Sequence, residues 1–200
     1  MKTNVITVSN RSGEINRALD EADKVAVYKQ LSPKGALHLR LLTEEMMGLM
    51  RSITGEPEGI FWIEDTDGVY QLHLRVRTQM DADKRERLLS TASSGRNESA
   101  RGLMGRLRDF LSRGLSVDGT LPPSPLLLAG DMESTSSTLD WEWSMTEYQN
   151  ELSVLVGQKD PAACEMWDEL EKSVVVHVAD EIKVSIRGAE AEMTILKKLV

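Results

Sequence analysis

Two adjacent carboxylates, Glu44 and Glu45, stand in the middle of an otherwise apolar segment. Glu44 falls between Leu41 and Met47, and Gly48 follows it by one helical turn. A carboxylate buried at such a position needs a hydrogen-bonding partner or a chemical role, such as general-base catalysis. Two interpretations are open: Glu44 lines a functional site, or it lies at the edge of the apolar stripe in contact with water.

A second candidate site is the segment between Gly95 and Gly105, which combines glycines, hydroxyl side chains and arginines beside a predicted helix. Free backbone N–H groups at a helix N-terminus attract phosphate, so these residues could bind an anion. The composition of an ordinary exposed loop explains them equally well. The pattern alone does not decide between the two.

Other kinds of chemistry find little support in the sequence. His38, His73 and His177 are far apart and none has a metal-ligand spacing such as His-x-x-x-His, so no structural metal is expected. No Gly-x-Ser-x-Gly elbow supports a serine triad, and the chain has neither a Walker loop nor Gly-x-Gly-x-x-Gly. Cys164, the single cysteine, is predicted to pack in the core rather than to react.

Composition narrows the class of protein. The 200 residues, 40% of them hydrophobic, suffice for one main core. No stretch reaches the roughly 18 apolar residues of a membrane-spanning helix, so a cytoplasmic protein without membrane contact is expected. A single cysteine fits a reducing compartment. The net charge of -8 argues against a nucleic-acid partner, although basic side chains concentrate between residues 84 and 113.

The residues before the first candidate site predict a strand and two helices. Residues 4–8 are β-branched and short, as in a strand, and residues 13–30 carry apolar side chains at helical spacing. Ser32 then caps a helix with Pro33 at its first position, and the helix runs to Gly55. Its apolar stripe includes Leu42, on the same helix as Glu44.

Two β-hairpins are predicted, one in the first half of the chain and one at its end. Residues 60–63 and 69–77 flank an Asp67-Gly68 turn, and the second strand alternates apolar with polar side chains. Residues 182–186 and 193–195 flank Gly188 in the same way. The alternation predicts a sheet that helices cover on one side. Short helices are expected at 81–91 and 98–111.

The middle of the chain breaks this regularity. Residues 113–160 are predicted to form an irregular insert whose end, residues 141–156, is helical, and residues 162–178 a helix that packs on the domain. Trp141 and Trp143 either anchor the insert on the body, the favoured interpretation, or form a partner-binding element. The main domain then comprises residues 1–112 and 178–200. The fold class is α+β, a two-layer α/β sandwich with a mixed or antiparallel sheet and helices on one face.

The order of elements resembles the GHKL-type ATP-binding fold, particularly the small anti-sigma factor serine kinases. The resemblance covers residues 1–111 and 178–198. In that family a helix carries a Glu followed, four residues on, by an Asn that holds magnesium. Here Glu44 is kept and Gly48 stands where the Asn would be.

Two further family motifs are altered. The family's Asp-x-Gly-x-Gly, whose Asp reads adenine, corresponds to Thr78, Met80 and Ala82 here. The family's Gly-x-Gly before a helix corresponds to a looser pattern, Arg101-Gly102-Leu103-Met104-Gly105. The resemblance implies that Glu44 would be the general base of an active enzyme, and that Arg101, Gly102 and Gly105 would hold the phosphates. It also implies ATP as the cofactor, bound weakly or not at all.

Two functional hypotheses follow. In the first, the chain is a regulatory protein of the anti-sigma factor kinase-like class with a degenerate ATP site, and it acts mainly by binding a protein partner; a homodimer is compatible with this. In the second, it is a non-enzymatic interaction or scaffold module that has lost nucleotide binding, with Met46, Met47, Met80 and Met104 filling the old site. Neither hypothesis requires a metal site.

Overall fold

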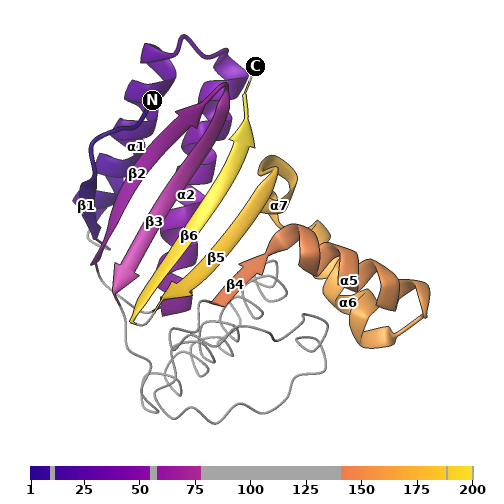
Figure 1. Cartoon of the computed structure of the whole chain (residues 1–200). Helices are drawn as coiled ribbons and strands as arrows, with labels where there is room; N and C mark the ends of the chain where they lie inside the picture. Colours follow the sequence, from indigo (N-terminus) through magenta and orange to yellow (C-terminus); the bar gives the residue numbers. More distant parts are fainter. Residues whose placement is uncertain (10–11, 55–57, 78–140, 188, 200) are drawn as a thin grey trace.

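The computed structural model describes residues 1–9, 12–54, 58–77, 141–187 and 189–199 (Figure 1). The predictions for residues 78–140, including both short helices and most of the expected insert, lie outside these ranges. The described elements follow in the order β1 (Ile6–Ser9), α1 (Ser12–Tyr28), α2 (Pro33–Thr54), β2 (Glu58–Thr66), β3 (Val69–Arg77), β4 (Trp141–Ser144), α5 (Met145–Gly157), α6 (Pro161–Glu171), α7 (Val174–Val178), β5 (Glu181–Arg187) and β6 (Glu190–Lys198).

The strands form one antiparallel sheet in the order β1-β2-β3-β6-β5-β4. The central pair joins the first half of the chain to its end, with Leu72 opposite Ile195. Figure 1 shows α1 and α2 against one face of the sheet, and α5 and α6 projecting past its β4 edge. The predicted α+β class is therefore confirmed, with an antiparallel sheet. None of the described helices is long and apolar enough to cross a membrane.

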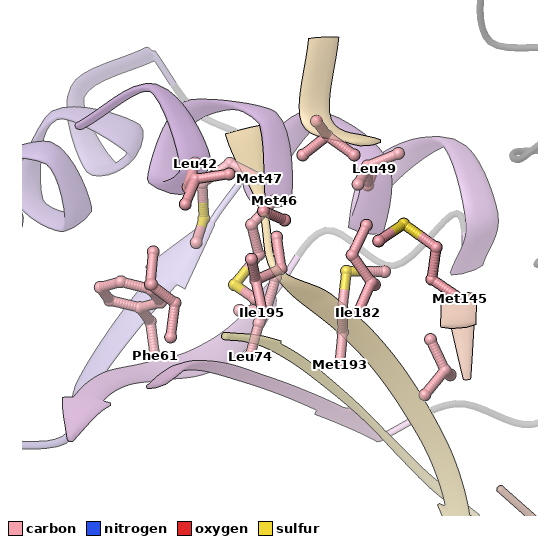
Figure 2. Close-up of a cluster of buried hydrophobic side chains, with 14 of the residues drawn as sticks. Leu42, Met46, Met47, Leu49, Phe61, Leu74, Met145, Ile182, Met193 and Ile195 are labelled. Atoms are coloured by element: carbon pink, nitrogen blue, oxygen red, sulfur yellow. The ribbon is translucent and has the colours of Figure 1, made fainter. Parts of the chain in front are cut away.

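The core lies between α2 and the sheet. Because side chains alternate along a strand, every second residue of β3, from Tyr70 to Val76, is buried. Figure 2 shows Leu42 and Met46 of α2 pointing toward these strands. The labelled side chains that meet them from the sheet are Phe61, Leu74, Ile182, Met193 and Ile195.

The ends of α2 and of the first hairpin follow the sequence signals. The Ser32 hydroxyl accepts a hydrogen bond from the Gly35 N–H at 3.1 Å, which caps α2 as predicted. The β2–β3 turn has positive φ at Asp67 (52°) and Gly68 (81°), the pattern of a type I′ hairpin. A Cβ on Gly68 would also lie 3.2 Å from the Leu199 carbonyl oxygen, so glycine is required there.

Two predicted helices differ in the structure. The helix expected over residues 141–156 begins only at Met145, because Trp141–Ser144 form the edge strand β4 opposite β5. The Trp-x-Trp spacing has the period of a strand, and Trp143 packs against the core opposite Val184. The Ser144 side chain then caps α5 by accepting from the Glu147 N–H at 3.3 Å.

The helix expected over residues 162–178 is divided into α6 and α7. The chain turns extended at Ser173, which precedes three consecutive valines. The short α7 starts after this break with those three valines, although β-branched side chains have low helix propensity. Asp160 caps α6 by accepting from the Ala162 and Ala163 N–H groups at 2.8 and 3.0 Å. Cys164 on this helix is exposed, so the prediction that it packs in the core is wrong.

Replacing Asp65 with Asn should make the free energy of unfolding fall less steeply as the pH is lowered into the acid range. The buried Asp65 carboxylate pairs with Lys29 and accepts from the Gly68 N–H at 3.1 Å. The Lys29 hydrogen bond, above all, lowers the pKa of Asp65 in the folded state. These contacts therefore stabilise the fold fully at pH values above the pKa of Asp in the unfolded chain, about 3.9. Their contribution to stability is lost as the pH falls through the lower pKa of Asp65 in the folded state.

Urea midpoints of wild type and Asp65→Asn between about pH 7 and about pH 2 measure this effect. Wild type should lose stability more steeply below about pH 4. The matched control is Asp67→Asn, an exposed carboxyl in the same turn, which should keep the wild-type slope. Equal slopes for Asp65→Asn and wild type would contradict the role assigned to this ion pair.

Candidate functional site

The α2 helix places Glu44 and Gly48 on its exposed side, one turn apart. Thr43, the neighbour of Glu44, is fully buried and donates its hydroxyl hydrogen bond to the Leu39 carbonyl at 2.8 Å. Met46 and Met47 are buried against the sheet (Figure 2). The helix thus turns its apolar stripe inward and leaves the Glu44 carboxylate in water, which favours the second of the two interpretations of this residue.

Glu45, the second of the two adjacent carboxyls, lies partly in the protein interior. It is half-buried, and burial first and the charge of Glu44 second raise its pKa. A raised pKa is one property of a carboxyl that takes up a proton near neutral pH. The prediction names Glu44 and misses Glu45, although the spacing of Glu45 from Leu42 and Leu49 indicates a position at the margin of the apolar stripe.

Gly48 leaves open space beside Glu44. A Cβ built on Gly48 would meet no atom of the described chain within 4 Å. Packing among these residues therefore does not demand a glycine, even though glycine costs a helix interior about 1 kcal/mol relative to alanine. A Cβ at this position is therefore compatible with the described packing.

The other predicted site residues, Thr78, Arg101, Gly102 and Gly105, lie outside the described residues. Of the predicted site, the described structure brings together Glu44 and Gly48 alone. Within the described ranges, no group of three or more His, Cys, Asp or Glu side chains could hold a metal ion.

A second polar assembly lies on the outer face of the sheet, the face opposite α1 and α2, at residues that the sequence analysis did not connect. The ring of Trp62 stacks on that of His73, with centroids 4.7 Å apart and planes 2° from parallel. His73 Nδ1 lies 3.1 Å from Glu192 Oε1. Arg75 donates to Glu192 Oε2 from Nε at 2.8 Å and from Nη2 at 2.7 Å. We call these four residues the outer-face cluster.

The carboxylates in and beside the outer-face cluster are paired with neighbouring side chains. Hydrogen bonds from His73 and then from Arg75 lower the pKa of Glu192, against the opposing effect of burial. Beside it, Lys2 pairs with Glu64 at 2.9 Å, and the Trp62 indole N–H donates to the same Glu64 oxygen at 2.8 Å. These contacts lower the pKa of Glu64. Each carboxylate therefore contacts a basic side chain and the ring nitrogen of an aromatic side chain.

The geometry of His73 does not make an open catalytic site. Its Nδ1 lies 3.1 Å from Glu192 Oε1 and 3.2 Å from Thr194 Oγ1. Its Nε2 is buried and has no hydrogen-bond partner among the described residues. Trp62 is only 5% exposed, so its ring offers no stacking platform either. The cluster acts as a cover for this face of the sheet.

An open groove of about 420 Å³ borders this cluster at the ends of β2 and β3. Its charged lining alternates in sign, with Arg75 and Arg77 beside Glu58 and Glu190. Arg75 is already paired with Glu192. The described lining is thus close to neutral and does not provide the concentrated positive charge that a triphosphate attracts.

Comparison with known proteins adds no relative. A scan against protein-family models and searches of curated proteins and of solved structures gave no match. Function is therefore inferred from the residues and geometry described above.

Replacing Glu44 with Ala should change the free energy of unfolding by less than about 0.5 kcal/mol, the range of exposed substitutions. The side chain is exposed and no buried group depends on it among the described contacts. Met46→Ala on the same helix is the matched comparison and should cost about 2 to 5 kcal/mol, because Met46 is fully buried. Urea denaturation measures both. A loss of about 1 to 3 kcal/mol for Glu44→Ala would show stranded donors and contradict the exposed position.

Replacing Glu192 with Ala should cost about 1 kcal/mol, because Arg75 and His73 lose their shared acceptor while Arg75 remains partly hydrated. Glu190→Ala, two residues earlier on the same strand and exposed, should cost less than about 0.5 kcal/mol. Urea midpoints at neutral pH give both values. Equal losses for the two variants would mean that the outer-face cluster adds nothing beyond general surface charge.

Proposed function

We propose that this chain is a regulatory protein of the anti-sigma factor kinase-like class, with a degenerate ATP site, and that it acts mainly by binding a protein partner. The support is partly architectural. An antiparallel sheet with α1 and α2 on one face agrees with the element order that suggested the GHKL-type resemblance. Fold alone does not imply activity, so the proposal depends on the site residues.

The observation that carries the proposal is that Glu44 and Gly48 lie one turn apart on the exposed side of α2. A carboxylate is present there, but the position one turn on has no side-chain oxygen with which to hold magnesium. Magnesium neutralises the phosphates of ATP and uses oxygen ligands. Without it, a protein with a net charge of -8 repels the triphosphate. Weak nucleotide binding and negligible turnover are the expected result.

The alternative function is an interaction or scaffold module with no nucleotide site. Met46 and Met47, two of the four methionines proposed to fill the old site, are buried in the stripe of α2 that faces the sheet, away from Glu44 and Gly48, so their burial does not distinguish the two hypotheses. Met80 and Met104, the other two, lie outside the described residues. Both hypotheses make protein binding the main activity, and they differ in whether a remnant of the nucleotide site persists.

Restoring an amide at position 48 tests for that remnant. We expect wild type to show no magnesium-dependent phosphate release and little thermal shift with ATP. Gly48→Asn should gain a shift of the melting temperature that requires both ATP and magnesium. A ligand at about 100 times its Kd adds about 2.7 kcal/mol, and each kcal/mol raises the melting temperature of a chain of this size by about 2–4 °C.

Gly48→Ala is the matched control, because it removes the glycine without adding a ligand. It should be more stable than wild type by up to about 1 kcal/mol, with no response to ATP. If Gly48→Asn behaves like Gly48→Ala, the scaffold alternative is favoured. Sustained phosphate release by wild type that Glu44→Gln abolishes would overturn the degenerate-site proposal.

Protein binding is tested separately. Cross-linking of the tagged full chain in its own cells, with mass spectrometry, should recover a partner that forms a stoichiometric complex with the purified chain. Because the nucleotide site is degenerate, the Kd of that complex should change by less than about twofold with ATP and magnesium. A tenfold change, about 1.4 kcal/mol of coupling, would contradict the degenerate site, and failure to reconstitute any complex would contradict the partner-binding role.

A further inference from the structure

We draw no further inference here: the strongest candidate, the outer-face cluster of Trp62, His73, Arg75 and Glu192 on the sheet, carries nothing because its charged groups pair with one another and nothing in the described structure shows a ligand or partner that reaches the buried Nε2 of His73.

Discussion

The contact of α2 with the sheet is the constraint on which the rest of the structure depends. A helix with 3.6 residues per turn can bury only one stripe, and α2 buries the stripe that contains Leu42 and Met46 between itself and β3 and β6. Once that stripe is fixed, Glu44 and Gly48 must face outward and Glu45 must lie at the boundary. The core thus decides which carboxylate meets water and which is partly desolvated.

The outer face of the sheet poses a different physical problem, because no described helix packs on it (Figure 1). Instead, long side chains on neighbouring strands cover the apolar surface of this face. Trp62 is buried by stacking on His73, and both Lys2 and Arg75 lie over its ring, at 5.1 and 5.4 Å from the centroid. Cation–π contacts and paired charges allow aliphatic stems to cover an aromatic ring while their heads stay hydrated. The same contacts tie β2, β3 and β6 together.

Much of this fold could be predicted from the sequence, because the signals are local. The Ser32-Pro33 start of α2, the Asp67-Gly68 turn and the alternation along β3 each depend on neighbouring residues, and the structure agrees with them. The prediction is wrong where a short segment fits both the period of a helix and that of a strand. The sequence predicts a helix for residues 141–144, because the pairing partner that makes them a strand, β5, is about 40 residues away in sequence.

The candidate site was predictable to a smaller extent. Spacing located Glu44 and Gly48 on one side of a helix, but the degree of burial that separates Glu44 from Glu45 depends on how the helix sits on the sheet. The outer-face cluster could not be predicted, because His73 and Glu192, which are in contact, are 119 positions apart in the sequence. Only strand register brings such residues together, and a register is fixed by the whole sheet.

The exposed glycine on α2 links stability to the proposed function. Gly48 is conformationally costly in the middle of a 22-residue helix, and no described packing contact requires it. On the proposed function, its lack of a side chain removes a magnesium ligand while Glu44 remains exposed. A lone carboxylate on an acidic protein repels phosphate but can still pair with a basic side chain of another protein. On the proposed function, the same two positions would disfavour nucleotide turnover and leave a carboxylate for a protein interface.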